Sequence, residues 1–205
     1  MAKDRSIPEI IWATPLYEFL RQCNASPLER QVLDCGAGGS EPPLSLFYQY
    51  GYETYGIEIA THALDEASQF CREKGMTLNI FRGDMRTIPF ASESFSFVYS
   101  FNAIFFMTKP DIARSVREME RVLRPEGLLY MNFVSVDEPD KGPFCATAPA
   151  RELLKSERFA QHEDDEADAY FEAFEILRKE KQFIDKVYGR GRSLQVYVEY
   201  IARKR

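Results

Sequence analysis

The stretch at residues 31–40, QVLDCGAGGS, constrains the fold of this chain more than any other. It reads as a short buried strand, Val32-Leu33, that leads through Asp34 into a glycine-rich turn and then into the first turn of a helix. Glycines at 36, 38 and 39 let the backbone adopt positive φ and come close to a ligand without a Cβ in the way. A strand-to-helix turn of this kind is typical of the ligand sites of α/β sheets.

Similar strand-and-helix units follow along the chain. We expect strands at 54–58, 77–82, 95–101 and 128–134, alternating with helices around 44–50, 63–74 and 108–124. This alternation implies a parallel sheet covered on both faces by helices. Two more strands, 174–188 and 193–202, are joined by a turn at 189–192, and a hairpin cannot be parallel. The predicted fold is a Rossmann-like, doubly wound, seven-stranded and mostly parallel sheet with an antiparallel C-terminal strand.

The length of 205 residues is most simply one domain, residues 1–205. Within it we expect a leading helical segment at 1–27, with the helix over 8–23 interrupted or restarted at Pro15, and a core at 28–135. The rest, 136–205, should hold a loop that begins at 135 and extends to 150, a helix near 151–159 and the hairpin.

Composition excludes several classes of partner and site. The formal net charge is -6, so there is no uniform positive field for nucleic acid or anionic lipid. No segment reaches the ~20 apolar residues of a membrane span. The cysteines at 23, 35, 71 and 145 form no CxxC motif, so we expect no metal site, only thiols in a reducing, cytoplasmic compartment.

Several charged features have ordinary interpretations. The arginine row at 114, 117, 121 and 124 lies opposite the apolar face of its helix and should face water, and the acidic run at 163–168 should be solvated. The two histidines, His62 and His162, have no partner in a recognisable triad or metal motif, so surface roles are favoured.

A dinucleotide site is one interpretation of the glycine turn. A G-x-G-x-x-G pattern that starts at Gly36 needs a small residue at position 41, and the chain has Glu41. A pyrophosphate would also meet the negative charge of Asp34, whereas a cationic ligand would be attracted by it. An NAD(P)-dependent oxidoreductase is therefore the less favoured alternative.

The pattern hydrophobic-hydrophobic-Asp-x-Gly-x-Gly resembles instead the first motif of the class I S-adenosylmethionine-dependent methyltransferases, of the Methyltransf_11 type. Glu58 at the end of the second strand, Gly83-Asp84-Met85 after the third, and FVYSFNAIFFM fall where that family has its further motifs. The resemblance covers about residues 28–135. It implies that the cofactor is S-adenosylmethionine, bound by Asp34, Gly36, Ala37, Gly38, Glu58, Ile59, Asp84, Met85, Ser100 and Phe101.

By the same resemblance, Asp34 orients the amino group of the cofactor, Glu58 binds the ribose hydroxyls, and Asp84 accepts from the adenine amino group. The chain departs from the family pattern at three positions: Ser40 replaces a common third glycine, Ser96 an acid, and Phe106 a histidine. The change at Ser40 bears on the local backbone geometry of the turn, the one at Ser96 should do little to cofactor binding, and Phe106 removes a possible polar group near the acceptor.

The resemblance implies methyl transfer to a small-molecule acceptor, with residues 136–205 on the acceptor side. No catalytic residue is assigned. If the reaction uses a base, we expect it near Asn102, within 135–150, or at Tyr17, because these should overhang the carboxyl ends of the strands. A non-catalytic module that binds S-adenosylmethionine remains the alternative.

Overall fold

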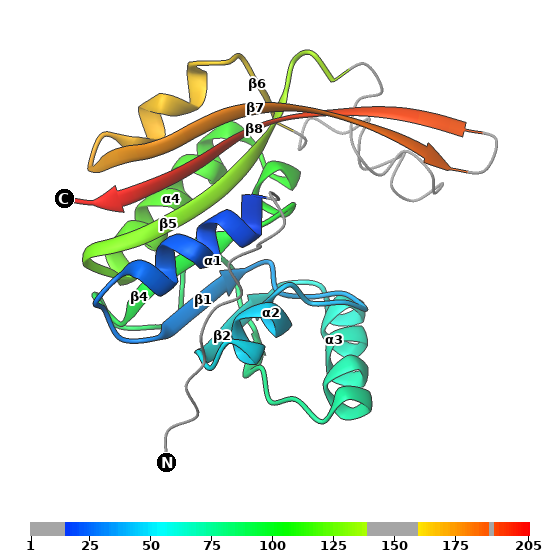
Figure 1. Cartoon of the computed structure of the whole chain (residues 1–205). Helices are drawn as coiled ribbons and strands as arrows, with labels where there is room; N and C mark the ends of the chain where they lie inside the picture. The colour runs from blue at the N-terminus through cyan, green and yellow to red at the C-terminus, as the bar shows by residue number, and fades with distance from the viewer. Residues whose placement is uncertain (1–14, 139–159, 189–190) are drawn as a thin grey trace.

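The computed structural model describes residues 15–138, 160–188 and 191–205. Figure 1 shows a single twisted sheet with helices on both sides. Its elements in chain order are α1 (Pro15–Ala25), β1 (Gln31–Cys35), α2 (Leu44–Gln49), β2 (Glu53–Glu58), α3 (Thr61–Lys74), β3 (Ile80–Arg82), β4 (Phe95–Ser100), η1 (Ile104–Phe106), α4 (Lys109–Val122), β5 (Leu123–Ser135), β6 (Gln161–His162), η2 (Glu166–Phe171), β7 (Phe174–Tyr188) and β8 (Gly191–Lys204).

Seven strands lie in the order β3-β2-β1-β4-β5-β8-β7, and the two-residue β6 pairs with β5 off this path. Strands β1 to β5 run parallel, whereas β8 is antiparallel to both β5 and β7. The predicted mostly parallel sheet with an antiparallel C-terminal strand is thus confirmed, and β6 is an addition. The strand order reverses between β1 and β4, so the carboxyl ends of these strands frame the crevice in which open α/β sheets bind ligands.

Two apolar layers hold the helices onto the sheet. On one face, Phe19 of α1 and Phe47 of α2 pack on Tyr99 and Tyr130, and the Phe47 and Tyr99 rings stack at 5.1 Å. On the other face α4 buries Ile112, Val116, Met119 and Val122. The spacing of these four residues is that of one helical stripe, which explains why α4 lies flat on the sheet.

Local signals set the ends of the helices. The hydroxyl of Thr108 accepts a hydrogen bond from the main-chain N–H of Asp111 at 3.3 Å, and Pro110 stands in the first turn of α4. Gly75 ends α3 in the left-handed conformation, with φ of 62°. Gly51 follows α2 with φ of 78°, as expected for a residue at the C′ position.

Some boundaries differ from the sequence prediction. The third strand covers only Ile80–Arg82, and the first helix is described from Pro15 onward and continues to Ala25. Strand β8 is longer than predicted, because Gly191 already pairs with Tyr188. The expected loop at 139–150, the helix near 151–159 and the first two residues of the turn at 189–192 lie outside the described residues.

The acidic run at 163–168 is exposed at residues 163–166, as predicted, and it also forms ion pairs that the sequence did not indicate. Lys179 of β7 contacts Asp165 and Asp168, each at 2.7 Å, and Lys109 pairs with Glu166. These contacts attach η2 to β7 and to the first residue of α4. The ion pairs are too exposed to contribute much stability one by one, so their main effect is to fix where this segment lies.

Two further surface predictions need correction. Arg121 donates to the main-chain oxygens of Ile88 and Phe90, and both Arg121 and Arg124 are partly buried, so only Arg114 and Arg117 of the predicted row are exposed. His162 is completely buried, with Nε2 3.2 Å from the Tyr170 hydroxyl, whereas His62 is exposed as expected.

Candidate functional site

The glycine turn after β1 is fixed to the end of β2. The main-chain N–H groups of Gly36 and Ala37 both donate to the oxygen of Ile57, at 2.9 and 3.1 Å. Gly36 has φ of 105°, and a Cβ there would lie 2.3 Å from the Cβ of Ala103. The turn therefore needs glycine for its conformation and for the close approach of the loop after β4.

Glu58 joins the glycine turn to the start of α3. Its Oε2 accepts from the main-chain N–H of Gly38 at 3.3 Å, and its Oε1 accepts from that of Ala60 at 2.8 Å. A Cβ on Gly38 would lie 2.8 Å from the Cγ of Glu58 and 2.6 Å from the Cβ of Ala63. The carboxylate predicted to bind ribose is thus held against the turn, and it remains partly exposed.

Asp34 is the most unusual residue of the region. Its side chain is 1% exposed, and neither carboxylate oxygen forms a well-aligned hydrogen bond with the described residues, although the buried Tyr99 hydroxyl is close enough to interact with it. Burial raises its pKa to about 8; the nearby Tyr99 hydroxyl opposes the rise and the charge of Glu58 adds to it. A buried carboxylate with so little hydrogen bonding is costly, so this position is suited to a cationic or hydrogen-donating ligand.

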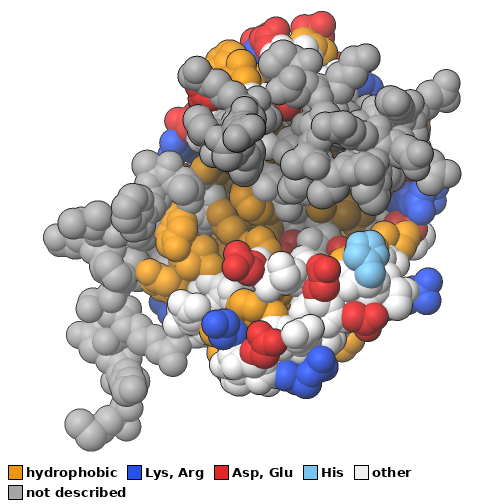
Figure 2. Space-filling model, turned by 90° about the vertical axis from the view of Figure 1, so that its right-hand side faces the viewer, with side chains coloured by type: hydrophobic (Ala, Val, Ile, Leu, Met, Phe, Trp, Pro, Cys, Tyr) orange, Lys and Arg blue, Asp and Glu red, His pale blue; other side chains and the backbone are white. Residues whose placement is uncertain are grey.

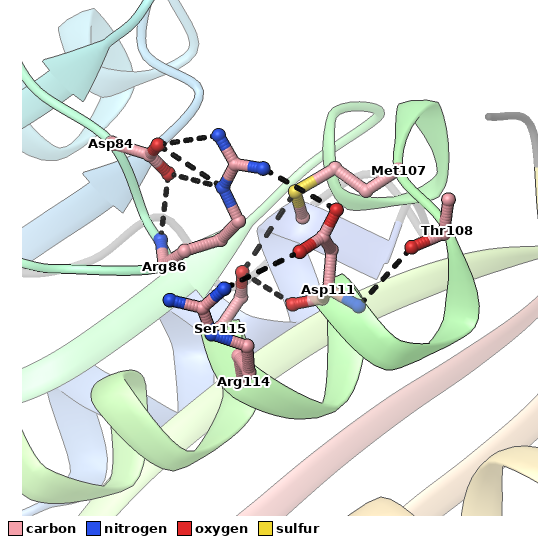
Figure 3. Close-up of polar contacts among 7 residues, drawn as sticks. All are labelled: Asp84, Arg86, Met107, Thr108, Asp111, Arg114 and Ser115. Carbon is pink, nitrogen blue, oxygen red and sulfur yellow. Dashed lines mark hydrogen bonds and ion pairs between the residues drawn. The ribbon is translucent and has the colours of Figure 1, made fainter.

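Asp84 lies in the loop after β3, and its carboxylate accepts hydrogen bonds from Arg86. Arg86 donates to it from Nη2 at 2.7 Å, from Nε at 3.0 Å and from the main chain at 2.9 Å (Figure 3). This guanidinium is the main reason that the pKa of Asp84 is lowered. The neighbouring Met85 brings the loop to the glycine turn, since its Cε lies 3.7 Å from where a Cβ on Gly36 would be.

The other predicted cofactor residues differ in solvent exposure. Ile59 follows β2 with 57% of its surface exposed, beside the predicted ribose position. Phe101 is half-buried, with its ring 6.2 Å from that of Tyr130. Ser100 is completely buried and donates its hydroxyl to the oxygen of Cys35 at 2.8 Å, so its side chain links β4 to β1.

The expected region for a base contains a pair of amides. Asn132 of β5 donates from Nδ2 to Oδ1 of Asn102 at 2.6 Å, and its own Oδ1 accepts from the main-chain N–H of Asn102 at 2.8 Å. Asn102 has φ of 55°, a left-handed conformation that asparagine tolerates. Tyr17 lies in the first turn of α1 and is partly exposed. Neither amide is a base, so no catalytic base follows from this geometry.

Three residues that the sequence analysis did not single out shape the site. A Cβ on Gly56 of β2 would lie 2.5 Å from the Cβ of Ala37, so the strand passes directly beneath the turn. A glycine inside a strand is a known sign of close backbone approach, and this signal was available in the sequence. The roles of Ala103 and Arg86 depend on tertiary contacts and had no sequence signal.

The carboxyl ends of the strands face one side of the molecule. Figure 2 views that side and shows hydrophobic side chains gathered in its centre with acidic side chains beside them. Within the described ranges, no group of three or more His, Cys, Asp or Glu side chains is placed to hold a metal ion. No described helix is long and apolar enough to cross a membrane.

Comparison with known families gives a match in the same region. Residues 33–131 match the Methyltransf_11 family model, described as a methyltransferase domain. The uncharacterized methyltransferase YcgJ of Bacillus subtilis (strain 168) is 30% identical over 120 residues, which are 58% of this chain and 45% of YcgJ. The chain thus spans less than half the length of this relative.

Solved structures of low sequence identity share the fold. A SAM-dependent methyltransferase from Methanosarcina mazei aligns with a TM-score of 0.67 at 19% identity, over 90% of this chain and 96% of that one. The 1,6-didemethyltoxoflavin-N1-methyltransferase of Burkholderia thailandensis, solved with bound S-adenosylhomocysteine, aligns with a TM-score of 0.64 at 14% identity, over 93% and 76%. The glycine turn, the acids at the strand ends and the match over 33–131 are features that this chain shares with the class I S-adenosylmethionine-dependent methyltransferases.

Proposed function

We propose that this chain transfers the methyl group of S-adenosylmethionine to a small-molecule acceptor. The observation that carries the proposal is Asp34, a buried carboxylate placed directly before the glycine turn, whose oxygens form no well-aligned hydrogen bond with the described residues although the Tyr99 hydroxyl is near. S-adenosylmethionine carries an ammonium and a sulfonium and no phosphate. A cationic group near Asp34 would stabilise the ionised form of this buried acid, whereas a pyrophosphate would oppose its ionisation, so the position favours S-adenosylmethionine over a dinucleotide.

The residues around the turn fit the rest of such a ligand. Gly36 and Gly38 leave no Cβ where the backbone would approach it, and a Cβ at either position would meet another residue closer than 3.0 Å. Glu58 is held by Gly38 and Ala60 with its carboxylate still partly exposed, so it can accept from the ribose hydroxyls. Ile59 and Met85 are the apolar groups that would pack against the adenine.

The bound cofactor would supply a methyl group already activated by the sulfonium. The protein then mainly needs to hold the donor and acceptor in line, and such placement lowers a barrier by up to ~7–11 kcal/mol in favourable cases. We infer that Asp34 and Glu58 fix the donor, and that the carboxyl ends of β4 and β5 carry the acceptor. No residue of the described ranges is proposed as a dedicated base.

Direct measurement separates this proposal from its alternatives. Calorimetry with S-adenosylmethionine and S-adenosylhomocysteine tests binding, and formation of S-adenosylhomocysteine in the presence of a metabolite panel tests turnover. We expect both ligands to bind and at least one acceptor to be methylated. Binding without any turnover favours a non-catalytic module, and no binding of either ligand contradicts both. A complex with NADH would instead support the oxidoreductase.

The net charge and the cysteines bear on the class of acceptor and on the cellular compartment. The net charge of -6 gives no general attraction for nucleic acid or anionic membranes, so we propose a free metabolite as acceptor. The thiols of Cys23, Cys35 and Cys71 are free, which agrees with a cytoplasmic location. Transfer of label from methyl-labelled cofactor to a compound of the metabolite pool would identify the acceptor class.

A further inference from the structure

Asn102 and Asn132 form a closed pair where β4 ends beside β5. The main-chain N–H of Asn102 donates to Oδ1 of Asn132 at 2.8 Å, and Nδ2 of Asn132 donates to Oδ1 of Asn102 at 2.6 Å. Asn132 is 1% exposed, so its amide is shielded from water, whereas Asn102 is partly exposed. The two bonds together fix the side chain of Asn102 in one orientation.

The polarity of this pair follows from its main-chain donor. A main-chain N–H can only donate, so the atom of Asn132 that meets it must be the oxygen. The nitrogen of Asn132 then faces the side chain of Asn102 and requires an oxygen there. The amide nitrogen of Asn102 is left on the outer side of the pair, and among the described residues no group accepts from its two N–H groups.

Asn102 lies next to the turn that forms the proposed cofactor site. The residue after it, Ala103, packs directly against that turn, since a Cβ on Gly36 would lie 2.3 Å from the Cβ of Ala103. On its other side Asn102 contacts β5 through Asn132. The N–H groups of the Asn102 amide therefore belong to a residue between the glycine turn and the end of β5, where the acceptor is proposed to lie.

An amide nitrogen at this position discriminates between ligand groups. It donates and cannot accept, so it pairs with an oxygen that carries lone pairs and no proton. An amine or ammonium in the same place would set donor against donor and leave both unpaired, which costs free energy in a partly buried site. The carboxylates of Asp34 and Glu58 have the opposite polarity, which fits the donor groups of the cofactor.

We propose that Asn102 binds an unprotonated oxygen of the methyl acceptor, and that Asn132 is the positioning residue that orients its amide. The acceptor class is then a carboxylate or carbonyl compound rather than a simple amine. The inference rests on the proposed function, because it assumes that methyl transfer takes place beside the glycine turn. Asn132 is buried behind Asn102 and acts only through it.

The experiment begins with the class of acceptor. The full chain is assayed with methyl-labelled S-adenosylmethionine and a metabolite panel, half of which are compounds with a carboxylate or carbonyl group and half amines with neither. We expect the methylated compounds to belong to the first half. The compound that is methylated fastest is then used to measure KM and kcat in each variant.

Variants of the two asparagines test their separate roles. Asn102→Gly removes the donor but tolerates the φ of 55°, and it should raise KM for the acceptor about tenfold, as for one lost hydrogen bond. Asn102→Asp should raise KM further, because a carboxylate repels an unprotonated oxygen. In Asn132→Asp the new carboxylate can accept from the main chain and from the amide nitrogen of Asn102. That amide should then turn its oxygen toward the acceptor, so KM should rise although Asn102 is intact.

Asn79→Gly is the matched control. Asn79 is also an asparagine in the left-handed conformation, with φ of 50°, and its Nδ2 donates to the main-chain oxygen of Thr54 just before β3. Its replacement should leave KM for the acceptor unchanged. All of these variants should bind S-adenosylhomocysteine as the wild type does, because none of them alters the proposed contacts of the cofactor.

Each outcome decides a different statement. Methylation of the amines alone, or a wild-type KM in Asn102→Gly, overturns the role of Asn102, and a wild-type KM in Asn132→Asp overturns the role of Asn132. If Asn132→Asp or Asn102→Gly does not fold, Asn102→Asp decides, and an unchanged KM there overturns the inference. Loss of S-adenosylhomocysteine binding in Asn102→Gly would show a structural role and overturn it as well. Absence of turnover with every compound in the wild type contradicts the proposed function instead.

Discussion

The main-chain N–H of Gly38 donates a hydrogen bond to Oε2 of Glu58 over 3.3 Å, across the gap between the glycine turn and the end of β2. The other oxygen of the same carboxylate accepts from Ala60 at the start of α3. One side chain therefore ties together the two strand-to-helix turns that frame the proposed cofactor site. Its removal should affect both ligand affinity and the geometry of the turn.

Replacement of Glu58 by alanine should weaken the binding of S-adenosylmethionine by roughly 1.5–3 kcal/mol, because charge-assisted hydrogen bonds to the ribose are lost. Calorimetry of the folded variant measures this change. Glu66→Ala is the control, since Glu66 is an exposed acid on α3 with no role in the site, and it should bind as the wild type does. Unchanged affinity in a folded Glu58→Ala protein would show that the ribose contact lies elsewhere.

The second prediction concerns the buried acid Asp34 and pH. Its pKa in the folded chain is about 8, compared with 3.8 for an ordinary aspartate, so the folded state binds more protons between these values. The free energy of unfolding should therefore fall as the pH rises through that window. Asp34→Asn removes this contribution, and urea unfolding from pH 5 to pH 8 should show a smaller loss of stability in the variant.

Glu199 provides the matched control for Asp34. It is a second buried acid, on β8, and burial raises its pKa to about 8 as well. Glu199→Gln should flatten the pH dependence in the same direction, yet only Asp34→Asn should weaken S-adenosylhomocysteine binding. Equal affinities for the two variants would remove Asp34 from the proposed site.

Much of the fold could be predicted because it depends on local patterns. The apolar stripe from Ile112 to Val122, the cap at Thr108 and the glycine after α3 each set an element without help from the rest of the chain. The short β3 is different. Only Ile80–Arg82 pairs with β2, and the extent of pairing at a sheet edge depends on its single neighbour.

The sequence could place the candidate residues together at the strand ends, but it could not give their electrostatics. The sequence places Asp34, Glu58 and Asp84 at the ends of three strands that pairing then brings together. That Asp34 is buried with little hydrogen bonding while Asp84 is bound by Arg86 depends on tertiary packing, which sequence spacing does not encode. His162 was misjudged for the same reason, since a lone histidine carries no sequence signal of burial.

The third prediction separates backbone strain from steric conflict in the glycine turn. Gly36 and Gly39 have similar positive φ values of 105° and 99°, but a Cβ on Gly36 would meet Ala103 at 2.3 Å, whereas one on Gly39 would meet nothing within 4 Å. Gly39→Ala should cost about 1–2 kcal/mol from conformation alone. Gly36→Ala should cost about 2–5 kcal/mol because overpacking adds to the same strain. Urea unfolding of both variants measures the difference, and equal losses would show that the loop at Ala103 moves aside freely.

The fourth prediction uses His162, which is buried against Phe133 and contacts the Tyr170 hydroxyl. Burial, together with the charge of Lys109, lowers its pKa to about 4, and the charge of Glu166 partly opposes this shift. The unfolded chain, with an ordinary histidine near 6.5, therefore binds more protons between about pH 4 and 6.5, so stability should fall as the pH drops through this range.

The loss should approach about 3 kcal/mol near pH 4, since one pKa unit corresponds to about 1.4 kcal/mol. His162→Gln keeps a hydrogen-bonding group opposite Tyr170 but does not titrate, so thermal or urea unfolding of this variant should show a shallower decline in acid. His62→Gln is the control, because His62 is exposed and its replacement should leave the acid limb unchanged. If both variants decline as steeply as the wild type, protonation of His162 does not limit the acid stability of the fold, and the paired acids that join η2 to β7 become the groups to test.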